Sequence, residues 1–133
     1  FTSQINATGM STHIIQTGFR NDVPQIAASC DVLVLPSERE GLPRVVLESL
    51  ASGTPVITSA NEGAMEIIEH DQNGYIVPIG DGSAIAERIR YLYNHPEENK
   101  RLAHGAIETI NTKMSHQETV NNMTEFFQSL LTH

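Results

Sequence analysis

The sequence has one cysteine, no long apolar run and few basic residues, and each shortage excludes a class of protein. With Cys30 alone, no disulfide can form within the chain, and we expect a reducing compartment, the cytoplasm. Its apolar stretches fall far short of the ~20 residues that a membrane-spanning helix needs. The formal net charge of −8 disfavours binding to nucleic acid.

Metal-ligand spacing is also lacking among the six histidines, so we expect no metal site and no cofactor. A length of 133 residues fits a single domain, residues 1–133, and a hydrophobic content of 39% argues against disorder. Because the chain begins with Phe1, we expect a piece of a longer protein, truncated at its N-terminal end.

The first two-thirds of the chain alternate short apolar runs with helical patterns. We expect strands at residues 13–17, 31–35, 55–58 and 75–77. Between them we expect helices from the cap Asp22 to about residue 29, at 43–53, and at 64–69. This alternation predicts an α/β fold, a Rossmann-like parallel sheet with helices on both faces. The opening strand-helix-strand unit of such a fold is not recognisable, so the sheet looks incomplete.

The last third, residues 83–133, reads as a helical extension. Asp81 or Ser83 can cap its first helix, and Pro96 can open the second. Gly105 is expected to weaken the second helix by about 1 kcal/mol relative to alanine. Ser115 and Glu118 form a capping-box pattern before a third helix. The inward face of that helix is expected to hold Val120, Met123, Phe127, Leu130 and Leu131.

The most informative stretch is residues 37–53, which follows a predicted strand and leads into a helix. Parallel α/β sheets bind ligands outside the carboxyl ends of their strands. Glu40 precedes the helix, and Glu48 can lean back toward its start, so both carboxylates can accept hydrogen bonds from sugar hydroxyls. First-turn amides have no partner within the helix and can bind phosphate; they belong to Arg44, Val45 and Val46.

Simpler interpretations remain open from the residues alone. Arg44 and Glu48 are four residues apart on the predicted helix and can form a surface ion pair. Glu40 can serve only as a favourable negative charge at a helix start.

The sequence reads Glu40-Gly-Leu-Pro-Arg-Val-Val-Leu-Glu48, followed by Ser-Leu-Ala-Ser-Gly-Thr-Pro-Val56. Four flanking segments accompany it in order: Gly18-Phe-Arg20, Asp31-Val-Leu-Val-Leu-Pro-Ser37, Glu62-Gly-Ala-Met-Glu66 and Asn73-Gly-Tyr-Ile-Val-Pro78. Together they resemble the signature of group 1 retaining glycosyltransferases of the GT-B fold, over most of residues 14–90. The resemblance implies the C-terminal, nucleotide-sugar-binding half of such an enzyme.

The resemblance also implies roles for particular residues. The family's first glutamate contacts the donor sugar, and Glu40 matches it as the catalytic-site residue; the second contacts the ribose hydroxyls, and Glu48 matches it. Backbone groups between them hold the sugar and the distal phosphate, at positions that match Gly41, Leu42, Pro43 (by its carbonyl), Arg44, Val45 and Val46. The base lies against a loop that matches Gly18, Phe19 and Arg20. A position in the core is the alternative for Phe19.

The parent enzyme, by resemblance, transfers a sugar from a nucleoside diphosphate sugar, with retention, to a glycan or a lipid-linked acceptor. Its upstream phosphate-binding cations and its N-terminal acceptor-binding domain are not in this chain, so we expect weak donor binding and no transfer by the piece alone. We expect a cytoplasmic protein, with peripheral membrane association through the parent, at the inner face of the membrane. An exposed C-terminal helix can drive self-association.

Other functions are weighed beside this one. A nucleotide-sugar epimerase of related fold would not need two glutamates at this spacing. A flavodoxin-like receiver needs aspartates at the carboxyl ends of strands, whereas Asp31 begins its predicted strand. A non-catalytic nucleotide-binding or interaction module also stays open.

Overall fold

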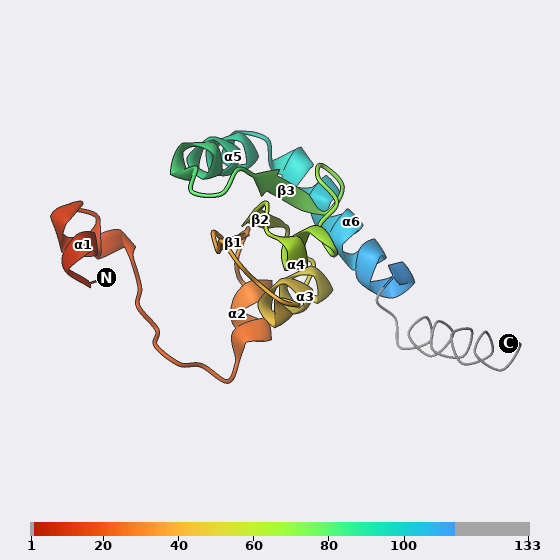
Figure 1. The fold of residues 1–133 in the computed structure, drawn as a ribbon, viewed down its shortest axis with the longest axis horizontal. Coiled ribbons are helices and arrows are strands. Elements are labelled where there is room, and N and C mark those ends of the chain that lie inside the picture. Colours follow the sequence, from red (N-terminus) through yellow and green to blue (C-terminus); the bar gives the residue numbers. More distant parts are fainter. Residues whose placement is uncertain (1, 114–133) are drawn as a thin grey trace, which may run out of the picture.

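A computed structural model describes residues 2–113 of the chain. Its body is a parallel sheet with helices on both sides (Figure 1), which confirms the predicted fold class. The helices and strands follow in this order: α1 (Thr2–Ala7), the 3-10 turn η1 (Ser11–His13), α2 (Val23–Ala28), β1 (Leu33–Leu35), α3 (Arg44–Ala51), β2 (Val56–Ser59), α4 (Glu62–Met65), β3 (Gly74–Val77), α5 (Gly82–Asn94) and α6 (Pro96–Lys113).

The three strands lie side by side in chain order, β1-β2-β3, and all run parallel. Val34 pairs with Ile57, and Ile57 pairs with Tyr75. A parallel strand covered on both faces needs apolar or hydrogen-bonded side chains along its whole length. The central strand, β2, meets this condition, because each of its four residues is buried.

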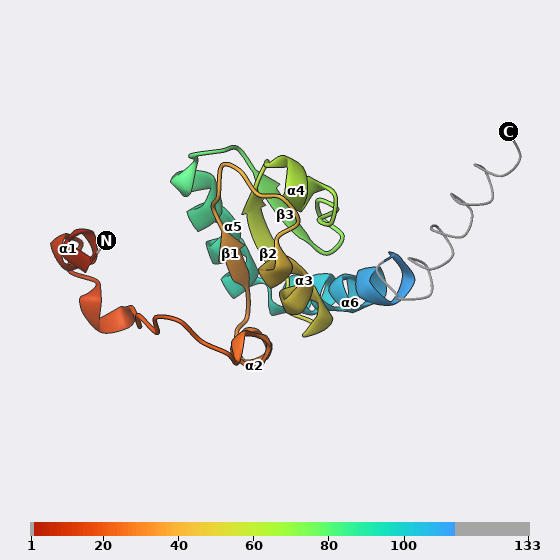
Figure 2. The same cartoon turned by 60° about the horizontal axis from the view of Figure 1, so that its bottom comes forward.

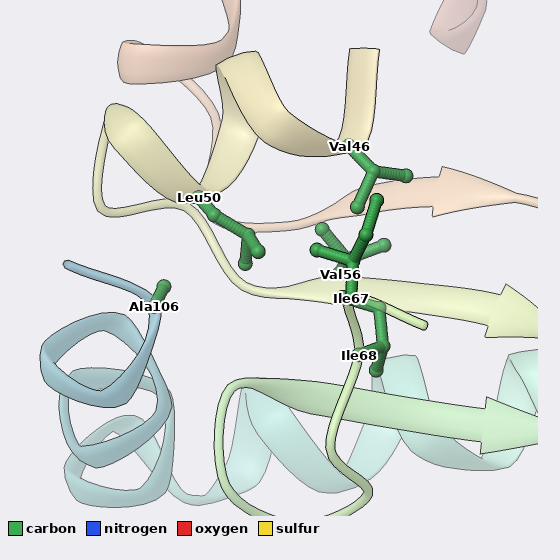
Figure 3. Close-up of a cluster of buried hydrophobic side chains, with 6 residues drawn as sticks. All are labelled: Val46, Leu50, Val56, Ile67, Ile68 and Ala106. Atoms are coloured by element: carbon green, nitrogen blue, oxygen red, sulfur yellow. The ribbon is translucent and has the colours of Figure 1, made fainter. Parts of the chain in front are cut away.

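Successive residues of β2 face opposite sides of the sheet, and each side has its own core. On one face, Val56 packs with residues of α3, α6 and the segment before β3 (Figure 3): Val46, Leu50, Ile67, Ile68 and Ala106. On the other face, Ile57 packs with residues of β3, α5 and α6: Tyr75, Val77, Leu92 and Leu102. Helix α6 contributes to both cores and thereby joins the two layers.

Helix α3 is fixed at its C-terminal end. Gly53 takes φ +71°, the left-handed conformation that commonly ends a helix. Beyond it, Ser49 Oγ donates to the Thr54 carbonyl at 3.0 Å, and Thr54 Oγ1 donates to the Ala27 carbonyl at 2.7 Å. Because the second of these bonds reaches α2, it holds α2 against α3 on one face of the sheet.

Gly105 has a role in packing that its helix propensity does not reveal. A Cβ atom at this position would lie 2.1 Å from the carbonyl oxygen of Gln72. The backbone of α6 therefore needs a glycine here in order to pass the turn before β3. Glycine lowers the helix propensity of α6 at this position, but it is the residue that permits the contact with the Gln72 carbonyl.

Several predicted boundaries are wrong. Residues 13–17 form no strand in the described structure; they are exposed, and Ile15 is 88% exposed, because no neighbouring strand lies beside them to complete their hydrogen bonds. The helix expected at 64–69 lies at Glu62–Met65, because the side chain of Asn61 caps it earlier. Strand β1 begins at Leu33 rather than at residue 31.

The helix ends before and after the sheet follow the sequence more closely. Asp81 accepts a hydrogen bond from the Ala84 amide at 2.9 Å and caps α5, as predicted, and Pro96 begins α6. Asp22 precedes α2 but makes no capping bond, since its carboxylate is taken by Arg20. The helix predicted after Ser115 lies outside the described residues, and so does its proposed role in self-association.

The N-terminal part of the chain runs clear of the sheet. Figures 1 and 2 show α1 and the segment that leads to α2 extending away from the body on the side of β1. This arrangement places residues 14–20 far from the carboxyl ends of the strands.

Candidate functional site

The loop of residues 36–43 joins β1 to α3 at the carboxyl edge of the sheet. Asn61 fastens this loop to the next strand, because its Nδ2 donates to the carbonyls of Ser37 at 3.1 Å and Ser59 at 3.2 Å. Its Oδ1 accepts from the Ala64 amide at 2.9 Å and caps α4. Asn61 is buried, and its side chain bonds to three backbone groups, so it holds the loops in place.

Gly63 lets α4 approach the same loop directly. A Cβ atom on Gly63 would lie 1.4 Å from the carbonyl oxygen of Gly41 and 2.6 Å from that of Glu40. No other amino acid fits there unless the loop moves. The backbone of Glu40 and Gly41 is therefore seated on α4, which fixes where the Glu40 side chain begins.

An open cleft of about 420 Å³ lies at this edge of the sheet. It is lined by Glu38, Arg39, Glu40, Ala60, Asn61, Glu62 and Ile79. Among the described residues, none of its charged side chains has an ion-pair partner. Three carboxylates share the cleft with one guanidinium, so its net charge is negative and its polar groups are available to a ligand.

The start of α3 offers amides next to Glu40. Pro43 is the residue before the helix, with φ −75° and ψ 102°, and not its first helical residue as predicted. In the described residues the amides of Arg44 and Val45 have no hydrogen-bond partner. The Val46 amide, which was predicted to be free, donates to the Pro43 carbonyl at 3.0 Å, because the first turn is tightened. Two amides therefore remain for an anion at the positive end of the helix.

Glu48 lies one turn further along α3, and its side chain is 30% exposed. Its Oε1 lies 3.6 Å from Nη2 of Arg44, whose side chain is 89% exposed. The surface ion pair that the sequence left open is therefore present, although such a pair stabilises a helix by only about 0.2–0.5 kcal/mol. Glu48 does not line the cleft. Glu40 precedes α3 and Glu48 lies within it, but the structure does not bring their carboxylates into one cavity.

The other residues predicted to hold the ligand are not among those that line the cleft. Gly41 and Leu42 are exposed on the loop, whereas Pro43 is buried. Phe19 is 94% exposed, so a place in the core is wrong for it. Gly18 takes φ +65°, and Arg20 binds Asp22 through two hydrogen bonds of 2.7 and 2.5 Å. Those bonds lower the pKa of the Asp22 carboxyl and raise that of Arg20.

Within residues 2–113 no group of three histidine, cysteine, aspartate or glutamate side chains could hold a metal ion. The same residues contain no helix that is both long and apolar enough to cross a membrane.

Sequence reasoning missed Asn61 and Gly63, which position the predicted residues. An asparagine directly before Glu62-Gly63 is a recognisable helix cap, and that signal could have found Asn61. Nothing local signals Gly63, because its contact is with a loop some twenty residues earlier in the chain.

Free amides at a helix start beside an unpaired carboxylate, at the carboxyl edge of a parallel sheet, define an α/β domain suited to a phosphorylated, hydroxyl-rich ligand. Residues 1–109 match the family model of the glycosyl transferases group 1. The chain belongs to that family, and the epimerase and signalling alternatives are not favoured.

Relatives with known names support the same family. The chain is 36% identical to "Putative glycosyltransferase EpsD" of Bacillus subtilis over 92% of its own length and 32% of that protein. It is 34% identical to "Lipopolysaccharide core biosynthesis glycosyltransferase LpsE" of Rhizobium meliloti over 77% of its length and 30% of that protein. The chain thus spans about a third of the length of these curated relatives.

Solved structures show the same fold. Anabaena HepE in complex with UDP matches with a TM-score of 0.89 and 27% identity, over 96% of this chain and 35% of that one. The C-terminal domain of LpcC from Francisella tularensis, a glycosyl transferase group 1 family protein, matches with a TM-score of 0.78 and 27% identity, over 86% of this chain and 60% of that one. The GT-B, Rossmann-like fold class is therefore established for this chain.

Proposed function

We propose that this chain is the donor-binding domain of a longer glycosyltransferase, which transfers a sugar from a nucleoside diphosphate sugar with retention. The observation that carries the proposal is the start of α3, where two amides without partners stand beside Glu40 at the carboxyl edge of the sheet. The complexes of HepE with UDP and with UDP-glucose support a uridine nucleotide as the first donor to test.

Most of the predicted residues have a role in this proposal. Glu40 accepts hydrogen bonds from hydroxyls of the donor sugar, and the amides of Arg44 and Val45 bind the distal phosphate. Those amides also stabilise the charge that develops on the departing diphosphate, which is the main work of such a site. Glu48 binds the ribose hydroxyls, which requires that it leave its weak pair with Arg44. Gly18, Phe19 and Arg20 hold the base, which requires that the exposed segment before α2 lie closer to the carboxyl edge of the sheet in the intact protein.

No metal has a part in this proposal, because the helix start and cations elsewhere in the intact protein neutralise the diphosphate. Residues 2–113 contain no nucleophile with a base partner, and in this proposal the leaving phosphate assists a displacement on the same face of the sugar. The acceptor, a glycan or a lipid-linked glycan, binds to another domain, and the names of the relatives point to envelope polysaccharides. A cytoplasmic protein at the inner face of the membrane fits these substrates.

A binding panel on the intact gene product tests the proposal. UDP, GDP, ADP and their glucose conjugates are titrated by calorimetry, with and without EDTA. We expect one nucleotide to bind, no effect of EDTA, and a loss of more than about tenfold in affinity for Glu48→Ala, as for other hydrogen bonds to charged groups.

Glu87→Ala is the matched control, because Glu87 is an exposed glutamate on α5 outside the cleft. The affinity of this variant for the nucleotide should equal that of the unchanged protein. Failure of every nucleotide to bind the intact protein would refute the donor-binding role. Equal losses for Glu48→Ala and Glu87→Ala would remove Glu48 from the site.

A further inference from the structure

We infer that Glu38 and Glu62 make the cleft beside Glu40 selective for an uncharged saccharide and exclude saccharides that carry a carboxylate. The inference rests on the proposed function, since it assigns a substrate class to the site that contains Glu40. It concerns two residues to which the sequence pattern gave no role.

The topology brings these residues together. Glu38 and Glu40 follow β1, Glu62 follows β2, and Ile79 follows β3. Because the three strands are adjacent and parallel, the segments after them meet at the same edge of the sheet and enclose the cleft of about 420 Å³.

The loops that carry the carboxylates are held rigidly. Asn61, next to Glu62, bonds to the Ser37 carbonyl, next to Glu38. Gly63, on the other side of Glu62, is in contact with the backbone of Glu40 and Gly41. The two walls of the cleft are therefore joined by these contacts, which hold the backbones that carry the carboxylates at a fixed separation.

The described residues do not neutralise the charges of the cleft. Glu38, Glu40 and Glu62 have no ion-pair partner among residues 2–113, and Arg39 is the single cation lining the cleft within that part of the chain. An ionised carboxylate only accepts hydrogen bonds, so it binds sugar hydroxyls well. A sugar carboxylate offers no donor and is repelled, and one guanidinium cannot offset three carboxylates.

An uncharged saccharide in this cleft has two sources, the sugar of the donor or the sugar of the acceptor. Glu40 lines the cleft, whereas Arg44, Val45 and Glu48 do not, so the geometry fits a sugar ring and not the diphosphate. Both sources present the same hydroxyls, and the experiment below separates them.

The first arm measures the affinity of the intact protein for UDP, UDP-glucose and UDP-glucuronic acid at low salt. We expect UDP-glucose to bind about tenfold more tightly than UDP-glucuronic acid, with a smaller ratio at 1 M salt because screening weakens exposed charges. The double variant Glu38→Gln/Glu62→Gln should reduce the ratio to about threefold or less. The charge-matched control Glu87→Gln/Glu97→Gln, in exposed positions on α5 and α6, should keep it.

The second arm repeats the comparison by NMR with methyl glucoside and methyl glucuronide, in the presence of saturating UDP. A preference that depends on Glu38 and Glu62 in the first arm assigns the cleft to the donor, and one found only in the second assigns it to the acceptor. Equal ratios for the two double variants in both arms would overturn the inference. Binding of UDP with no such preference would leave the proposed function intact, whereas failure of UDP, GDP and ADP alike to bind would end both.

Discussion

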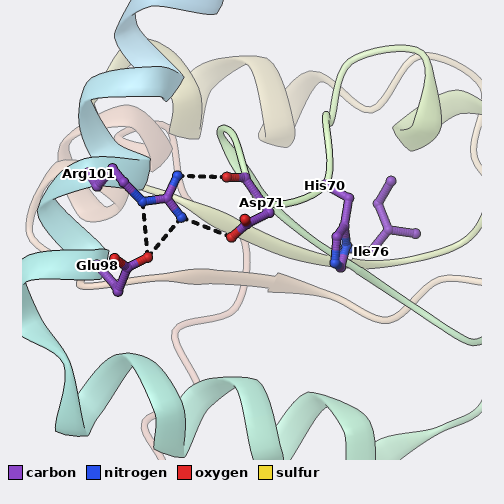
Figure 4. A network of polar contacts seen from close by, with 5 residues as sticks. All are labelled: His70, Asp71, Ile76, Glu98 and Arg101. Carbon is purple, nitrogen blue, oxygen red and sulfur yellow. Dashed lines mark hydrogen bonds and ion pairs between the residues drawn. The ribbon is translucent and has the colours of Figure 1, made fainter.

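Two ends of the same sheet treat their polar groups in opposite ways. At the carboxyl edge, Glu38, Arg39 and Glu62 line an open cleft and make no ion pair within the described residues. In the turn that leads into β3, Asp71 and Arg101 are bonded to each other and to their surroundings (Figure 4). The charged side chains of the first region are available to bind a ligand, whereas those of the second region are paired with other residues of the fold.

The polar side chains of the turn before β3 make several hydrogen bonds within the protein. Arg101 donates to the carbonyl of Asp71 at 2.7 Å, to its carboxylate at 2.8 Å and to Glu98 at 2.8 and 3.0 Å. His70 accepts from the Ile76 amide at 3.0 Å through Nδ1, and thereby closes the outer edge of β3. Asp71 holds φ 66°, a conformation that a non-glycine residue rarely adopts, and the bonds from Arg101 compensate for it.

Both ends rely on a glycine where two backbones meet. Gly63 allows α4 to contact the Glu40 loop, and Gly105 allows α6 to contact the carbonyl of Gln72. Both regions are therefore held by a close approach of two backbones, and what distinguishes them is whether their polar side chains have partners. Rigid loops with unpaired charges indicate a binding site, because the ligand then supplies the missing partners.

We expect the largest loss of stability for Gly63→Ala, which disrupts the contact between α4 and the loop that carries Glu40. The added Cβ would overlap the Gly41 carbonyl, so the loop must move, and overpacking of this kind costs about 3 kcal/mol at the upper end of its usual range. We expect that loss of unfolding free energy in urea, together with weaker binding of the nucleotide sugar.

Gly82→Ala is its control, because nothing lies within 4 Å of a Cβ at Gly82, the first residue of α5. Its stability should equal or exceed that of the unchanged protein, since alanine is the better helix former. A stability of Gly63→Ala within about 0.5 kcal/mol of the unchanged protein, a change typical of neutral surface sites, would show that the close approach does not exist.

Much of this architecture could be predicted from short-range patterns. The apolar runs predicted β1, β2 and β3. The helical pattern between Pro43 and Gly53 predicted α3. In each case the residues that determine the element lie within it or at its ends. The motif around Glu40 indicated the family, and the comparison with known proteins confirmed it. Its individual ligand contacts stay predictions.

The errors arise where a distant part of the chain decides the outcome. Residues 13–17 have the composition of a strand, but a strand also needs a neighbour, and none is present beside them in the described structure. Val46 has the position of a free amide, but the carbonyl of Pro43 turns back to accept its hydrogen. Gly105 looked unfavourable in a helix, and only its contact with Gln72 explains it.

The second prediction tests the bonded region through Asn73, which is fully buried. Its side chain accepts from the Glu69 amide at 3.0 Å and donates to the Ile67 carbonyl at 3.1 Å and to Thr109 Oγ1 at 3.0 Å. Asn73→Ala leaves the Glu69 amide and the Ile67 carbonyl without these partners, which costs about 2 kcal/mol. We expect that loss by urea denaturation, with no change in nucleotide affinity where the protein is folded.

Asn94 provides the comparison, because it is an exposed asparagine at the end of α5. Asn94→Ala should change the unfolding free energy by less than about 0.5 kcal/mol. A loss of nucleotide affinity in folded Asn73→Ala would mean that the two ends of the sheet are coupled, and the contrast between them would not hold.

The smallest expected change in unfolding free energy concerns two arginines, of which one has ion-pair partners and the other has none within the described residues. Arg101→Ala removes exposed ion pairs with Asp71 and Glu98, where the side chain of Arg101 is 42% exposed, and pairs of this kind contribute at most about 1 kcal/mol. Arg39→Ala removes an equal charge that has no partner within residues 2–113, so it should leave the unfolding free energy unchanged. Chemical denaturation in urea at low and at 1 M salt measures both, and the loss for Arg101→Ala should shrink with salt because screening weakens its pairs. If Arg39→Ala proves the more destabilising, Arg39 has a partner in the folded protein, and the cleft is less open to a ligand than its geometry indicates.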